Sequence, residues 1–195
     1  ALFCFGYGWF VTFYGTDPNR YVAGPVIFSL GMICIALFST AATIIRQIIG
    51  TFGQVSKYVL PGIGYLSAVL TVIGGVHILH SSPDSASFVA GHVVCGVGFI
   101  TACVATTATS STRFTMITEN ARKSDHNVPP KAFTRTQGLM LIAVAAILSL
   151  TAWIWAFVLL AKSGAHPKYF VAGHVMIGLA SICTCLITLV ATIAR

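Results

Sequence analysis

The side chains in this sequence that are best suited to chemistry are its six histidines. Five of them lie close to places where the chain is expected to reverse direction, and these are the candidate pH-sensing residues: His77, His80, His92, His166 and His174. The sixth, His126, lies in a separate polar stretch. Because an imidazole changes charge near pH ~6.5, a group of histidines at one end of a protein predicts a response to acidity.

Two of these histidines occupy the same position in a segment that occurs three times. The three copies are FVAGHVVCGVGFITACVATTATSSTR at Phe88–Arg113, FVAGHVMIGLASICTCLITLVATIAR at Phe170–Arg195 and YVAGPVIFSLGMICIALFSTAATIIR at Tyr21–Arg46. They align without gaps, so His92 corresponds to His174, and the third copy has Pro25 at that position. The recurrence indicates one structural unit that is used three times.

Each copy is long and apolar enough to cross a membrane as a helix. About 25 residues at ~1.5 Å per residue extend about 37 Å, which exceeds the ~30 Å hydrocarbon core of a bilayer. The whole chain is 56% hydrophobic and only 8% charged, whereas a soluble domain has about 25% charged residues. The sequence therefore predicts an all-α, polytopic transmembrane helical bundle.

Apolar segments precede each copy, so each copy is expected to be the second helix of a hairpin. We expect three parallel hairpin repeats, with about six spans, at residues 1–46, 57–113 and 137–195, and a long loop at 114–136. They form a single transmembrane domain over 1–195. The chain begins at Ala1, already inside an apolar run, and stops at the end of a span. We therefore expect a fragment of a longer protein.

The basic residues predict the orientation, because Lys and Arg collect in cytoplasmic loops. One side of the predicted bundle has eight of them, which are Arg46, Lys57, Arg113, Arg122, Lys123, Lys131, Arg135 and Arg195. The other side has three, which are Arg20, Lys162 and Lys168. The loop at 114–136 is thus expected in the cytoplasm, and the five clustered histidines on the outer side.

Several roles for these histidines remain open at this stage. His92 and His174 lie one turn into their helices, where the helix dipole and partial burial oppose a positive charge, so protonation would favour a structural switch. Alternatively, each imidazole only bonds to the loop of a neighbouring hairpin. A third interpretation is haem ligation by two of His77, His92 and His174. Since the motif persists where Pro25 replaces histidine, we expect no cofactor.

A stripe of small residues follows one face of the fourth predicted span. It contains Gly91, Cys95, Gly98 and Ala102, and small faces let helices approach closely in lipid. We expect a helix-packing seam, with a pore lining as the alternative. The hydroxyl-rich end of the span, from Thr106 to Ser111, is expected to bond to its own carbonyls one turn back.

Conventional catalysis has little support in this sequence. The four acids, Asp17, Asp84, Glu119 and Asp125, all fall in expected loops, and no nucleotide-binding, nucleophile or metalloprotease motif is present. The six cysteines lack metal-ligand spacing, so we expect no metal site. We expect a protein that is not an enzyme and binds no nucleic acid. The expected partners are membrane lipid and either a second copy or another membrane protein.

The recurring [FY]VAG[HP]V motif at Tyr21–Val26, Phe88–Val93 and Phe170–Val175, with the stretch TAATIIRQ at Thr40–Gln47, resembles bacterial inner-membrane proteins of the YhiM type. The resemblance extends over nearly the whole chain. It implies a multi-pass protein of the bacterial inner membrane, from a longer family of about ten spans that is linked to growth at low pH. A pH-responsive channel or transporter-like protein is the first expectation that follows. A structural membrane protein that binds lipid or a partner is the alternative, and a haem-binding cytochrome is another.

Overall fold

The computed structural model describes residues 1–16, 20–49, 54–81, 84–123, 135–164 and 166–193. Six α-helices and no strands occur in these residues. The helices are α1 (Leu2–Tyr14), α2 (Arg20–Ile49), α3 (Gln54–Ser81), α4 (Ser85–Lys123), α5 (Arg135–Ala161) and α6 (Pro167–Ile193). The all-α prediction is therefore confirmed.

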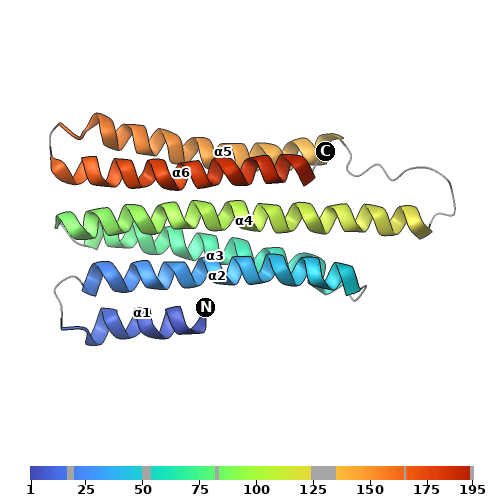
Figure 1. Ribbon diagram of the computed structural model, residues 1–195, viewed down its shortest axis with the longest axis horizontal. Helices are drawn as coiled ribbons and strands as arrows, with labels where there is room; N and C mark the ends of the chain where they lie inside the picture. The colour runs from blue at the N-terminus through green and yellow to red at the C-terminus, as the bar shows by residue number, and fades with distance from the viewer. Residues whose placement is uncertain (17–19, 50–53, 82–83, 124–134, 165, 194–195) are drawn as a thin grey trace.

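The helices run side by side, and helix α4 occupies the middle of the arrangement (Figure 1). It contacts α2, α3, α5 and α6, and the other close pairs are α1 with α2, α2 with α3, and α5 with α6. The most apolar 18-residue stretch of the span Ser85–Ser110 in α4 is 78% buried. The same stretches of the other four spans are only 22% to 33% buried. Helix α4 is therefore the central helix, and it contributes more residues to the core than any other helix.

Five of the six helices are long and apolar enough to cross a bilayer. Their apolar spans are Val22–Ile45, Tyr58–Ser81, Ser85–Ser110, Leu139–Ala161 and Pro167–Ala191, and α1 is shorter. Large apolar side chains cover the outside of the bundle; for example, Phe38 is 72% exposed and Leu66 is 60% exposed. Since soluble proteins rarely expose such extended apolar surfaces, this surface is suited to lipid. The prediction of a polytopic membrane bundle is confirmed.

The glycine of each VAG motif faces the helix that precedes it. A Cβ atom added at Gly24 would lie 2.9 Å from the carbonyl oxygen of Gly8 in α1, and one at Gly91 would lie 3.1 Å from that of Gly75 in α3. A Cβ added at Gly173 would lie 3.2 Å from the backbone nitrogen of Leu160 in α5. A missing side chain thus lets the backbones of α1 and α2, α3 and α4, and α5 and α6 approach closely.

The expected loop boundary at 114–136 is wrong, because α4 continues to Lys123 and α5 already begins at Arg135. Likewise, α2 continues beyond Arg46 to Ile49, and α3 begins at Gln54. The segment 114–123 contains no Gly or Pro, and a helix satisfies its own backbone hydrogen bonds whether lipid or water surrounds it. The loss of apolar character therefore marks the end of a span but not the end of a helix.

The prediction for the hydroxyl-rich end of α4 is confirmed for the residues whose side chains the structure describes. Thr106, Thr107 and Thr109 donate to the carbonyls four residues earlier, at 2.9, 3.1 and 2.9 Å. Ser110 does the same at 2.9 Å, and the side chain of Ser111 lies outside the described part. These hydroxyls are paired within their own helix, so burial leaves them satisfied.

Candidate functional site

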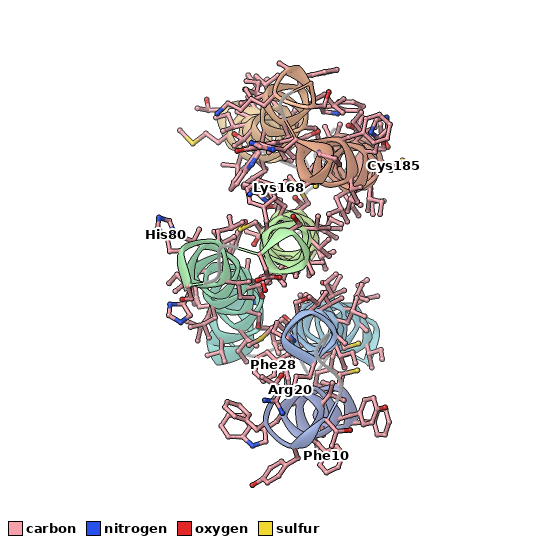
Figure 2. The ribbon with its side chains drawn as sticks, turned by 90° about the vertical axis from the view of Figure 1, so that its left-hand side faces the viewer. Phe10, Arg20, Phe28, His80, Lys168 and Cys185 are labelled. Atoms are coloured by element: carbon pink, nitrogen blue, oxygen red, sulfur yellow. The ribbon has the colours of Figure 1, made fainter. Side chains whose placement is uncertain are left out.

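The candidate site is the end of the bundle where α1, α3 and α5 end and α2, α4 and α6 begin, which we call the hairpin-turn end (Figure 1). Figure 2 looks onto this end. His77 and His80 lie in the last turns of α3, and His92 and His174 lie near the starts of α4 and α6. His166 immediately precedes α6. The structure thus brings the five candidate histidines to one end, whereas His126 lies outside the described residues.

His92 is the buried member of this group, with 4% of its surface exposed. Its Nδ1 atom lies 2.8 Å from the carbonyl oxygen of Phe88, to which it donates a hydrogen bond. Its ring lies 4.4 Å from the ring of Phe88 and 5.7 Å, edge-on, from that of Trp155 in α5. Phe88 in turn contacts Tyr169 of α6 at 5.0 Å. His92 therefore lies in an aromatic layer where α4, α5 and α6 meet.

His174 repeats the local geometry of His92 but not its burial. Its Nδ1 atom donates to the carbonyl of Phe170 at 2.8 Å, and the two rings are 4.2 Å apart. The motif itself sets this geometry, because residues four apart lie on the same face of a helix. The side chain of His174 is nevertheless exposed. Equivalent sequence positions thus have different surroundings, because α4 is central and α6 is not.

The other three histidines are exposed. His80 points away from the bundle (Figure 2), and its Nδ1 donates to the carbonyl of Val76 at 2.9 Å. The Nε2 atom of His77 lies 3.3 Å from the hydroxyl of Ser81, and the ring of His166 lies 6.3 Å from that of Tyr169. Among the described residues, no group of three or more His, Cys, Asp or Glu side chains has a geometry that could hold a metal ion.

The two repeat histidines have different ring neighbours. The ring of His92 contacts Phe88 and Trp155, while the ring of His174 contacts Phe170. In both, Nδ1 donates to the helix's own backbone, which leaves Nε2 as the nitrogen for any further bond. Their described contacts do not bring the two imidazoles to one cavity.

The small residues of α4 lie against α3. A Cβ on Gly98 would come within 3.1 Å of the backbone nitrogen of Val72, and the thiol of Cys95 lies 3.8 Å from the Val72 carbonyl. Gly91 contacts α3 through Gly75, as described above. Ala102 is half-buried. The arrangement is a packed helix seam in which the backbones of α3 and α4 lie very close together.

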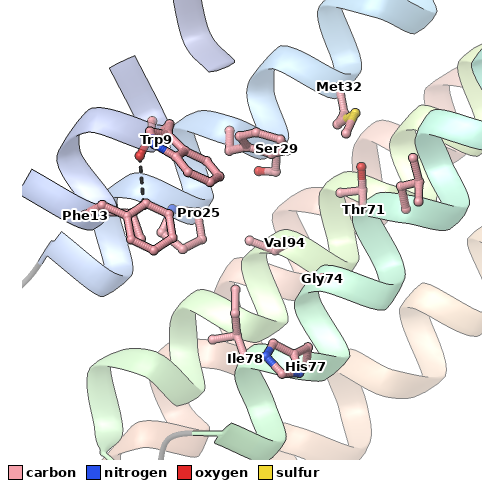
Figure 3. Close-up of a pocket in the computed structure, with 14 residues that line it drawn as sticks. Trp9, Phe13, Pro25, Ser29, Met32, Thr71, Gly74, His77, Ile78 and Val94 are labelled. Carbon is pink, nitrogen blue, oxygen red and sulfur yellow. Dashed lines mark hydrogen bonds between the residues drawn. The ribbon is translucent and has the colours of Figure 1, made fainter. Parts of the chain in front are cut away.

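A cavity of about 260 Å³ opens at the hairpin-turn end between α1, α2 and α3 (Figure 3). Trp9 and Phe13 of α1 and Pro25 of α2 line one side, and Gly74 and His77 of α3 line the other. Most of its remaining lining is apolar, with the hydroxyls of Thr12, Ser29 and Thr71 as further polar groups. Pro25, which replaces the repeat histidine, therefore borders a space, whereas His92 is packed.

Two residues at this end were not identified from the sequence as part of the site. The ring of Trp155 packs against His92 and Phe99. The ammonium of Lys168 lies 4.8 Å from the ring centroid of Phe88 in α4. A signal was present for Lys168, since a lysine directly before the aromatic pair at 169–170 places a cation beside π faces.

An all-helical chain with five apolar spans and a lipid-suited exterior is a multi-pass membrane protein. It belongs to the family described as "Protein of unknown function (DUF2776)", whose model matches residues 1–195. It is also 44% identical over 198 residues to the inner membrane protein YhiM of Escherichia coli strain K12. That match covers 100% of this chain and 56% of the relative, so the chain spans about half the length of the curated relative. No solved structure matches. The chain is a multi-pass protein of the bacterial inner membrane.

Proposed function

We propose that this protein acts in tolerance of low pH as a pH-responsive, channel- or transporter-like membrane protein, and not as an enzyme. In this proposal the chain forms three parallel hairpins whose turns face the periplasm, and His92 is the residue that responds to protons. The observation that carries the proposal is the burial of His92, at 4% exposure, in an aromatic layer shared by three helices.

A positive charge on His92 would have few compensating partners. Its Nδ1 already donates to the Phe88 carbonyl, and its ring contacts are apolar faces and edges. Lys168 lies over Phe88 and has the same sign of charge, and the carboxylate of Asp84 accepts a hydrogen bond from the backbone N–H of Ser87 at 2.9 Å. Because burying an unpaired charge costs several kcal/mol, protonation favours separation of α5 from α4 at the aromatic layer.

The exposed histidines take a secondary part in this proposal. His77, His80, His166 and His174 lie at the same end of the bundle as His92 and are exposed there. In this proposal they are additional pH-sensing residues beside His92. Contact with a partner membrane protein or a second copy of the chain would change how far these histidine side chains are exposed.

A second candidate function is a packing body that binds lipid or a partner protein. It is favoured by the complete pairing of the buried polar groups: in the described residues, no buried side-chain N or O atom lacks a hydrogen-bond partner. The cavity between α1, α2 and α3 is also lined mainly by apolar groups. A helical bundle that only packs would show both features and would not respond to pH through His92.

The test compares His92→Gln with the matched control His174→Gln in the full-length protein. Both substitutions remove one motif imidazole, but only His92 contacts Trp155. We expect the fluorescence of Trp155, measured between pH 5 and 8 around the histidine range, to change in the parent and in His174→Gln. The change should be lost in His92→Gln. Survival of cells at low pH should follow the same order.

Trp155→Phe shows whether Trp155 reports the change, because the change should then be lost. A pH response in His92→Gln that equals that of the parent would remove His92 from the proposal. Loss of the response only in His174→Gln would assign the role to the exposed histidine instead.

A further inference from the structure

A second hollow, of about 400 Å³, lies between the first turns of α4 and α6. Ser85 and Val89 line it from α4, while His166, Lys168 and Val171 line it from the start of α6. The hollow is separate from the cavity at α1, α2 and α3, with which it shares no residue. Its walls combine a cation, an imidazole and a hydroxyl with branched apolar side chains.

The charge of this hollow is positive. Lys168 is half-buried, and its ammonium lies 4.8 Å from the ring centroid of Phe88 and 5.8 Å from that of Tyr169, so two aromatic faces hold it over the α4–α6 contact. In Figure 2 the lysine lies between these two helices. Among the residues that the structure describes, no carboxylate lines the hollow. The described acid next to it in sequence, Asp84, is engaged by the backbone N–H of Ser87.

The hollow also lies at the depth where lipid headgroups occur. The apolar spans of α4 and α6 begin at Ser85 and Pro167, and both residues line it. Directly below, Phe170 and Val171 expose 56% and 48% of their surfaces. An occupant that reaches from the hollow along this surface must therefore have an anionic head and an apolar body.

We propose that the hollow binds the headgroup phosphodiester of an anionic phospholipid. The ammonium of Lys168 is the main partner of the phosphate, and the hydroxyl of Ser85 and the imidazole of His166 supply further hydrogen-bond donors. The glycerol and the first methylene groups lie against Val89 and Val171. This lipid site does not depend on protonation of His92, so it stands if the proposed pH response fails.

Native mass spectrometry of the detergent-purified full-length protein tests the proposal, with phosphatidylglycerol and phosphatidylcholine as probes. We expect tighter binding of phosphatidylglycerol, and about fivefold weaker binding of it to Lys168→Gln, the effect of one lysine at a membrane surface. Lys168→Arg should retain most of the binding. The matched control is Lys162→Gln, because Lys162 is exposed between α5 and α6 but does not line the hollow. Its affinity should match that of the parent.

A further variant and a competitor separate a lipid from a free anion. Val171→Trp fills the hollow from an exposed position, so it should reduce phosphatidylglycerol binding without changing the melting temperature. Inorganic phosphate should not displace the lipid at equal concentration. Equal affinity of Lys168→Gln and Lys162→Gln would overturn the proposal. Binding of inorganic phosphate to the parent without a preference for phosphatidylglycerol would overturn the lipid assignment.

Discussion

The contact between α3 and α4 makes a prediction that two adjacent glycines can test. Gly75 faces α4, and a Cβ atom added there would lie 2.5 Å from the sulfur of Cys95, 2.7 Å from its backbone nitrogen and 2.9 Å from the carbonyl oxygen of Gly91. A Cβ atom added at Gly74 would meet nothing within 4 Å. Gly75→Ala and Gly74→Ala thus make the same chemical change at neighbouring positions of one helix, only one of which faces α4.

The size of the effect follows from these distances. Ordinary van der Waals contact begins near 3.4 Å, so the 2.7 Å approach to the Cys95 nitrogen requires the two backbones to separate by about 0.7 Å. Overpacking of a well-packed core costs about 1–3 kcal/mol, and backbone cannot move aside as a flexible side chain can. Both variants carry the same change in helix propensity. The difference between their free energies of unfolding therefore isolates the steric cost.

Thermal unfolding in detergent, followed with a thiol-reactive fluorophore, measures this difference. Cys95, Cys103 and Cys183 are buried, so their labelling reports unfolding. At about 3 °C per kcal/mol for a chain of this size, Gly75→Ala should melt about 3–9 °C below Gly74→Ala. Gly74→Ala should melt at or slightly above the parent, because alanine has the higher helix propensity. Equal melting temperatures for the two variants would refute the close α3–α4 contact.

Two other contacts give further predictions. The hydroxyls of Tyr65 and Thr106 lie 2.9 Å apart across the α3–α4 interface, so Tyr65→Phe should cost about 0.5–1.5 kcal/mol. Tyr58→Phe, at a position that is 73% exposed, should leave the melting temperature unchanged. Hydrogen bonds from Ser87 lower the pKa of Asp84, so the ionised carboxylate stabilises the folded state above its unfolded pKa of about 3.9. Asp84→Ala should therefore melt lower than the parent at pH 7, and the gap should narrow as the pH falls below the unfolded pKa and through the lowered folded pKa of Asp84. A gap that persists in acid would contradict this contribution.

The positions of the spans were predictable because lipid imposes one strong requirement on the sequence. About 20 apolar residues must occur in succession, and the five long spans meet this requirement visibly. The helix ends at Ile49 and Lys123 were not predictable on the same basis, since polar residues continue a helix into water. The apolar segment at the start of the chain forms the shorter helix α1, of 13 residues.

The different burial of His92 and His174 was not predictable from the repeated motif, which sets only the local hydrogen bond to the residue four positions earlier. Burial depends on which hairpin lies in the middle. The sequence of α4 does indicate that this helix is central, because its small residues occupy more than one face. Gly91 and Gly98 approach α3, while a Cβ on Gly96 would meet Met176 and Leu179 of α6. A helix with small residues on opposite faces has neighbours on both sides.

The orientation of the hairpins is tested most directly by cysteine accessibility in intact cells, using full-length protein from which the native cysteines have been removed. Gly164→Cys places a thiol in the α5–α6 turn, where an added Cβ meets nothing within 4 Å, and Arg122→Cys places one near the opposite end of α4. We predict that a membrane-impermeant maleimide labels Gly164→Cys from outside and labels Arg122→Cys only after permeabilisation. Labelling of both positions from the same side would contradict the arrangement of outer histidines and cytoplasmic basic residues.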